Sequence, residues 1–156
     1  MELLVAMAVG GALLAGLVTS IYQVSWYAIR TRDQVVAQTD IDFATLWLKK
    51  DIPMAATTDL TDLDPVPRSS VTLTWTDSTG WAPPETASHT STYALSGTQL
   101  LRTYDGAVTI AGRQITYLGF TQSGRIISVV ITATGPGISR ASETLKFTVK
   151  MLPEGS

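Results

Sequence analysis

The chain has 156 residues and a formal net charge of -2 at pH 7. It has no cysteine, which excludes disulfides and thiolate metal sites. Its Lys and Arg residues form no basic block, and phosphate binding needs clustered cations, so we predict no nucleic-acid partner. The length provides for one long helix and one compact domain of about 100 residues.

The first element is an uncharged run from Leu3 to Ile29, which follows Glu2 and is closed by Arg30. As a helix it would be about 40 Å long, whereas a bilayer core is roughly 30 Å thick. A cleaved secretory signal has a basic start and an apolar core of about 7–15 residues, so this acidic, longer segment is predicted to be retained. We expect the run to lie in lipid, against other copies of itself, or in each at different times.

An ordinary membrane anchor is an alternative interpretation of the same run. Tyr22, Trp26 and Tyr27 lie where an interfacial aromatic belt would lie, just before Arg30 and Arg32. The positive-inside rule would then place the C-terminal domain in the cytoplasm. The Thr- and Ser-rich, lightly charged composition of that domain fits this location poorly.

The helix is predicted to continue beyond the apolar run, because residues 30–51 contain no Gly or Pro. Val36, Phe43 and Trp47 fall on one side of it, and Pro53 ends the pattern. We therefore expect one helix over residues 1–52, apolar over 1–29 and amphipathic over 30–52. A second, neighbouring stripe consists of Ile41, Ala44, Leu48 and Ile52.

The N-terminal sequence resembles the start of type IV pilins and type II secretion pseudopilins. The resemblance lies in Glu2-Leu3-Leu4-Val5-Ala6-Met7, which is followed by small and aliphatic residues. In that family a glutamate opens a long apolar helix. The sequence departs from the family pattern because it lacks the residues before the glutamate and the basic leader that a prepilin peptidase recognises. The resemblance thus implies that the sequence as written is trimmed or begins at an internal methionine.

The resemblance implies an α+β fold, in which a long N-terminal α-helix packs on a C-terminal antiparallel β-sheet domain over residues 53–156, the pilin fold. It implies a structural subunit of a type IV pilus-like filament, held first in the inner membrane as a single-pass precursor and later extracellular. The implied partners are copies of itself and the pilus or type II secretion assembly machinery. The subunit-assembly residues would be Glu2, Leu3, Leu4, Val5, Met7, Leu13, Leu14, Leu17, Val18 and Ile21.

Two features inside the apolar run have alternative interpretations. Glu2 is costly to bury without a partner, so in a filament it would pair with a neighbouring subunit's N-terminal amine; alternatively it is a solvated acid that favours the helix dipole. Gly10, Gly11 and Gly16 each cost a helix about 1 kcal/mol relative to alanine. They indicate either close helix packing through small faces or, as the family implies, a segment that melts on leaving the membrane.

Residues 53–68 contain three prolines and no regular period, so we predict a connecting loop. Asp59, Asp62 and Asp64 could surround a calcium ion, but EF-hand spacing is missing. We favour a solvated acidic loop and predict neither a metal nor another cofactor.

From Ser69 onward the apolar period changes to two, which predicts strands. Short loops with glycine separate them and indicate hairpins. We expect one antiparallel sheet whose apolar face rests on residues 34–52. The predicted strands cover residues 71–76, 92–95, 99–104, 107–111, 114–120, 125–134 and 144–151.

No catalytic residues are predicted. His89 is the only histidine and belongs to the polar run 85–91, which we interpret as a loop without a nucleophile signature. The segment 135–137 lacks the context of a phosphate-binding loop. A bare loop is favoured over O-glycosylation at residues 86–92. Besides the pilin, two alternatives remain: a minor pilin or pseudopilin, and a membrane-anchored cell-surface β-domain with a binding role.

Overall fold

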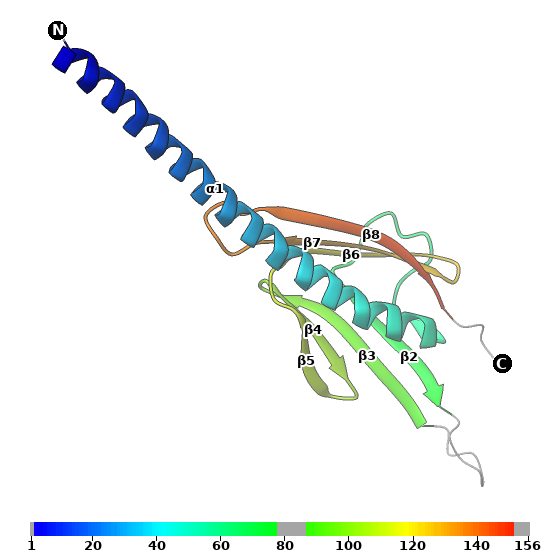
Figure 1. Cartoon of the computed structure of the whole chain (residues 1–156). Helices are drawn as coiled ribbons and strands as arrows, with labels where there is room; N and C mark the ends of the chain where they lie inside the picture. Colours follow the sequence, from blue (N-terminus) through cyan, green and yellow to red (C-terminus); the bar gives the residue numbers. More distant parts are fainter. Residues whose placement is uncertain (1, 78–86, 152–156) are drawn as a thin grey trace.

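The computed structural model describes residues 2–77 and 87–151. A single helix, α1 (Glu2–Asp51), is followed by one 3₁₀ turn, η1 (Ile52–Met54), and by antiparallel strands. Figure 1 shows the N-terminal half of α1 projecting from the domain and its C-terminal half lying along the strands. The α+β arrangement predicted from the sequence, with the helix first and the strands after it, is confirmed.

The end of α1 follows from local sequence. Lys49 and Lys50 lie in its last turn, where cations interact favourably with the helix dipole. Pro53 has no backbone N–H to continue the hydrogen-bond pattern, and the chain tightens into η1 at Ile52. The segment containing Gly10, Gly11 and Gly16 is continuous helix.

The strands form two separate sheets, where we had expected one. One sheet has the order β1-β2-β3-β4-β5 and the other β6-β7-β8, and all neighbours within each are antiparallel. The strands are β1 (Thr57–Thr58), β2 (Ser70–Asp77), β3 (Ala87–Ser96), β4 (Gln99–Tyr104), β5 (Ala107–Gly112), β6 (Ile115–Ser123), β7 (Ile126–Thr134) and β8 (Ser142–Lys150).

Two loop predictions are wrong in detail. The segment 53–68 contains the short strand β1, which pairs Thr57 with Thr74 of β2. Strand β3 begins at Ala87 rather than at Thr92, so the described part of the polar run 85–91 is largely strand and His89 pairs with Trp75. Residues 87–91 contain no alternation of apolar and polar side chains, so period alone does not reveal this strand, which the structure shows paired with β2.

The core lies where the second half of α1 contacts both sheets, through β5 on one side and through β7 and β8 on the other. The stripe of Ile41, Ala44, Leu48 and Ile52 is fully or almost fully buried. The other predicted stripe is not part of the core to the same extent, because Val36 and Trp47 are half-buried and Phe43 is 49% exposed. The helix places a narrower stripe against the domain than its sequence suggests. The strands contribute Tyr93, Leu100, Phe120, Ile127 and Ile131, among other residues, to the same core.

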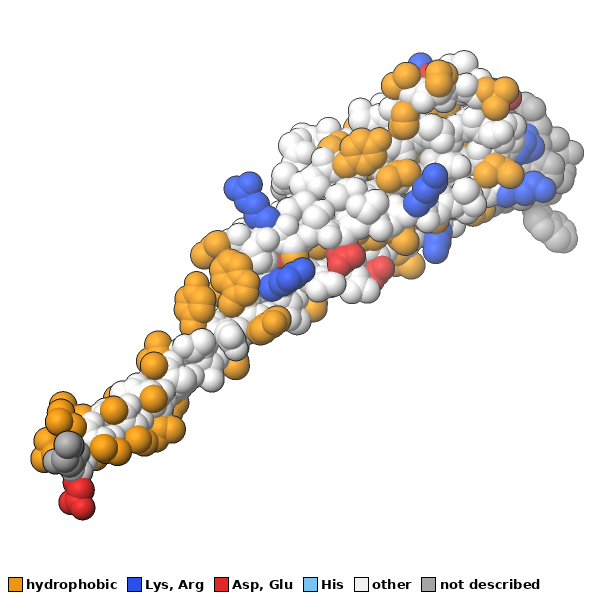
Figure 2. All heavy atoms as spheres, turned by 90° about the horizontal axis from the view of Figure 1, so that it is seen from above, with side chains coloured by type: hydrophobic (Ala, Val, Ile, Leu, Met, Phe, Trp, Pro, Cys, Tyr) orange, Lys and Arg blue, Asp and Glu red, His pale blue; other side chains and the backbone are white. Residues whose placement is uncertain are grey.

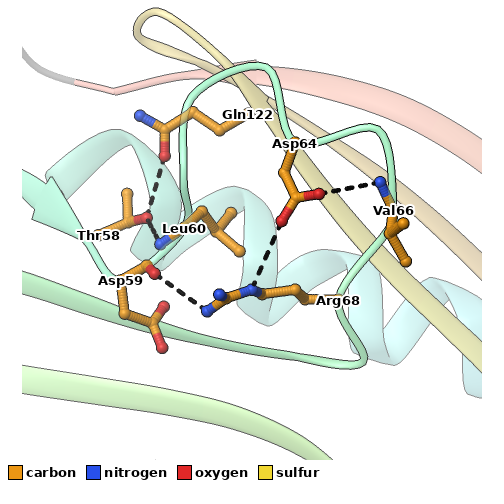
Figure 3. Close-up of polar contacts among 7 residues, drawn as sticks. All are labelled: Thr58, Asp59, Leu60, Asp64, Val66, Arg68 and Gln122. Atoms are coloured by element: carbon orange, nitrogen blue, oxygen red, sulfur yellow. Dashed lines mark hydrogen bonds and ion pairs between the residues drawn. The ribbon is translucent and has the colours of Figure 1, made fainter.

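The connection between β1 and β2 joins the two sheets (Figure 3). The Oγ1 of Thr58 donates to Oε1 of Gln122 on β6, over 3.1 Å, and isolated bridges pair Asp62 with Gln122 and Arg68 with Phe120. The acidic side chains of this loop serve as hydrogen-bond acceptors for different backbone N–H groups. Asp59 accepts from Thr72, Asp62 from Gly124 and Asp64 from Val66.

Candidate functional site

The candidate site is the free half of α1, residues 2–25, which projects from the domain (Figure 1) and in which every residue except Gly10 is exposed. None of its most apolar 18-residue window is buried inside the structure. Figure 2 shows hydrophobic side chains along this narrow stalk and an acidic side chain at its tip. By length and composition the helix could cross a membrane, a property that anchors and signal sequences share.

The predicted assembly residues all lie on this free segment and all are exposed. Glu2 is in the first helical turn. Because the apolar residues recur without a polar face, they surround the helix rather than forming one stripe. Between 59% and 74% of each residue remains exposed for Leu3, Leu4, Val5, Met7, Leu13, Leu14, Leu17, Val18 and Ile21.

The three glycines of this segment have open surroundings. A Cβ atom added at Gly10, Gly11 or Gly16 would meet no atom within 4 Å outside the local helix. Within one chain they therefore have no packing role. Their cost to helix stability, about 1 kcal/mol each, is uncompensated by any contact of the described chain.

Aromatic and basic residues mark the boundary between the free segment and the domain. Tyr22, Trp26 and Tyr27 are 70%, 44% and 66% exposed, and Arg30 and Arg32 follow them. Basic side chains gather where the stalk meets the domain (Figure 2). Amphipathic rings beside cations are the arrangement found at membrane–water interfaces.

Three aspartates fasten the second half of α1 to the domain, and sequence analysis did not identify them. Their spacings of seven and eleven residues place Asp33, Asp40 and Asp51 on one helix face. Asp33 accepts from the backbone N–H of Gly137, and Asp40 from that of Arg113. One sequence signal could have identified them. The three acids recur at helical spacing on the face that also contains Ala44, a residue of the predicted apolar stripe.

Asp51 is the most elaborate of these attachments. Its Oδ2 accepts hydrogen bonds from Ser91 Oγ (2.8 Å), Tyr93 Oη (2.7 Å) and Arg102 Nε (2.7 Å). The side chains of Asp51 and Arg102 are 2% and 10% exposed. Burial, and then the hydrogen bond to Asp51, raise the pKa of Tyr93 well above its usual range. Although burial opposes its charge, the hydrogen bond and charge of Asp51 raise the pKa of Arg102.

Aromatic rings extend this network to the surface. The Arg102 guanidinium lies 4.6 Å from the ring centroid of Trp47 and 4.8 Å from that of Tyr104. The His89 ring stacks on Tyr104, and its Nδ1 lies 2.6 Å from Oδ2 of Asp105. The hydrogen bond from His89 lowers the pKa of Asp105, with a further contribution from the backbone N–H of Thr90. These contacts fix the end of α1 to the five-stranded sheet, and nothing in them amounts to a nucleophile with its base.

Comparisons with known proteins add no family assignment. No protein-family model, curated protein or solved structure matches this chain. Among residues 2–77 and 87–151, no group of His, Asp and Glu side chains is arranged to hold a metal ion. The features that bear on function are therefore the exposed apolar helix and the domain fixed to its second half.

Proposed function

We propose that this chain is a structural subunit of a type IV pilus-like helical filament, stored in the inner membrane through residues 3–29 before assembly. In the filament the apolar helices of many copies bury one another in a central bundle, and the β-domains face water. The role is structural rather than catalytic. The pilus or type II secretion machinery would extract the subunit and deliver it to the extracellular filament.

The observation that carries the proposal is an apolar helical segment, exposed on every side, that continues without a break into the part of α1 packed on the domain. Fully burying one Leu side chain stabilises an assembly by about 1.5–3 kcal/mol. Leu13, Leu14 and Leu17 are each at least 59% exposed, so neighbouring helices have this surface available. The same surface suits lipid, which provides a store for the subunit before it assembles.

Glu2 supports the filament over a simple anchor. A carboxylate at the start of an apolar helix needs a cation or donors when other helices surround it. A staggered neighbouring subunit could supply its N-terminal amine as that cation. An anchor would instead leave Glu2 in water, where it contributes only about 0.3–1 kcal/mol through the helix dipole.

The first experiment is mass spectrometry and electron microscopy of filaments sheared from the source cells. If this chain dominates a preparation of thin fibres, it is the main building block. If it is a trace component beside another subunit, it is a minor pilin or pseudopilin. If it stays with the membranes and no fibre contains it, the anchored β-domain interpretation replaces the proposal.

A matched pair of substitutions tests the helix bundle. Leu14→Arg should abolish filaments by placing a charge among apolar helices, whereas Leu63→Arg, at a 74% exposed loop position, should leave them normal. The amount of each variant in membranes is measured too, because arginine at a span centre costs about 2.5–3.5 kcal/mol on insertion. Normal filaments from Leu14→Arg would refute the bundle. Glu2→Ala should reduce filaments while leaving membrane levels unchanged, and an anchored domain would be indifferent to it.

A further inference from the structure

The part of the domain nearest the free half of α1 is the loop between β7 and β8, residues 135–141, drawn in orange in Figure 1. Its Ile138 is 80% exposed, more than any other large hydrophobic residue in the described part of the chain. Single exposed apolar side chains are common on protein surfaces. Ile138 differs from the others in the domain because its loop lies beside the apolar half of α1 (Figure 1).

Contacts to Asp33 hold the loop in the conformation in which Ile138 is exposed. Asp33, only 3% exposed, accepts from the backbone N–H of Gly137 (3.0 Å) and from Ser139 Oγ (2.6 Å). A Cβ atom at Gly137 would overlap that carboxylate, so glycine is required for the approach. At the base of the loop the Gly135 N–H donates to the carbonyl of Ala141 over 2.8 Å.

The attachment point sets the height of the loop along α1. Asp33 lies four residues after Ile29, the last residue of the apolar run, which is about 6 Å along the helix axis. The polar headgroup zone of each leaflet is roughly 5–7 Å thick. The two lengths agree, so a loop fixed at Asp33 lies in the headgroup zone when residue 29 lies at the edge of the hydrocarbon core.

Helix tilt brings the loop closer to the bilayer. The apolar run, at about 40 Å, exceeds the hydrocarbon core by roughly 10 Å, and helices accommodate such an excess by tilting. The surface around the loop forms a shallow groove lined by Ile29, Arg32, Asp33, Pro136, Gly137 and Ile138. Tilting toward this side places the groove against lipid.

Charge favours one kind of bilayer. Arg30, Arg32 and Arg140 are exposed at this level. The carboxylate of Asp33 is buried and used by the loop. Glu143 is half-buried, and its Oε1 accepts a hydrogen bond from the uncharged amide of Gln34. The three exposed arginines outnumber this one carboxylate, and the excess of positive charge complements anionic phospholipid headgroups.

We propose that the β7–β8 loop is a membrane-contacting foot, which inserts Ile138 into the headgroup zone of an anionic bilayer and fixes the tilt of α1. This inference depends on the membrane-stored state of the proposed function, but not on the filament. The partner is the lipid surface, recognised through one apolar side chain and three arginines.

The chain has no cysteine, so a single cysteine can carry an environment-sensitive fluorophore at one site. The full chain bearing Ile138→Cys is labelled with a nitrobenzoxadiazole probe and inserted into phosphatidylcholine vesicles containing phosphatidylglycerol. Val108→Cys, 63% exposed on β5, is the matched control. At Ile138 we expect blue-shifted emission and quenching by lipid with a shallow spin label; at Val108 we expect neither.

An Ile138 probe that stays as aqueous as the Val108 probe in the inserted protein would overturn the proposal. An equal signal in pure phosphatidylcholine vesicles would overturn the selection of anionic lipid. A signal that grows with the protein-to-lipid ratio would assign the loop to a contact between copies instead. Filament assays on the same variants distinguish the membrane-contacting foot from the filament proposal. An aqueous probe with normal filaments refutes only the foot. A lipid-exposed probe without filaments refutes only the filament.

Discussion

Removing the carboxylate of Asp51 should destabilise the domain more than removing any exposed acid of the same helix. In Asp51→Ala, three hydrogen bonds to one oxygen are lost, and Arg102 keeps a charge with only 10% of its side chain exposed. Breaking a buried pair by deleting one partner costs about 3–5 kcal/mol. For a domain of about 100 residues, each kcal/mol shifts the Tm by about 4–8 °C, so the Tm should fall by at least about 12 °C.

The measurement is thermal unfolding of the full chain in detergent, followed by near-ultraviolet circular dichroism, which reports the packed aromatic side chains. Asp42→Ala is the control, because Asp42 is exposed on the same helix and its loss should change stability by less than about 0.5 kcal/mol. A Tm for Asp51→Ala within 2 °C of this control, on the order of 0.5 kcal/mol, would refute the reasoning.

The double variant Asp51→Ala/Arg102→Met separates the unpaired charge from the lost hydrogen bonds. Buried ion pairs can often be replaced by apolar residues at little cost, whereas an isolated buried charge cannot. The double variant should therefore be more stable than Asp51→Ala alone. If both variants unfold at the same temperature, the guanidinium is not what makes the single substitution costly.

Three further predictions concern packing, pH and the loop. Phe120→Ala, at a 1% exposed position, should cost about 3–5 kcal/mol by thermal or chemical unfolding, whereas Phe43→Ala, at a 49% exposed position, should cost far less. The hydrogen bond to His89 lowers the pKa of Asp105 in the folded chain. The Asp105 carboxylate therefore stabilises the fold fully above its unfolded pKa of about 3.9, and this stabilisation is lost as the pH falls through the folded pKa. The stability difference between the natural chain and Asp105→Asn should therefore be constant above about pH 5 and shrink toward pH 2; a difference independent of pH would contradict this. Gly137→Ala should destabilise the domain by about 1–3 kcal/mol through overpacking against the carboxylate beneath it, and an unchanged Tm would show that the loop can move away.

Much of the fold follows from the sequence alone. The extent of α1 depends on local rules, because no Gly or Pro interrupts residues 30–51 and Pro53 ends the helical hydrogen bonds. Most strands follow from alternation and from the glycines between them. The free apolar segment is likewise visible in the sequence, since no polar face interrupts residues 3–29.

The tertiary structure decided what depends on long-range pairing. Alternation identifies a strand but not its neighbour, so the division into two sheets was not predictable from period alone. The buried aspartates were missed for the same reason. An acid in a helix is normally solvated. Asp51 is stable inside the domain only because Arg102 and Tyr93, which follow it by 51 and 42 residues, donate hydrogen bonds to it. Exposure of Ile138 also depends on a contact over 104 residues, between Asp33 and Gly137. Local sequence determined where the helix and most strands lie. Contacts between residues far apart in the chain decided which face of each is buried, because a face is buried only when another part of the chain packs on it.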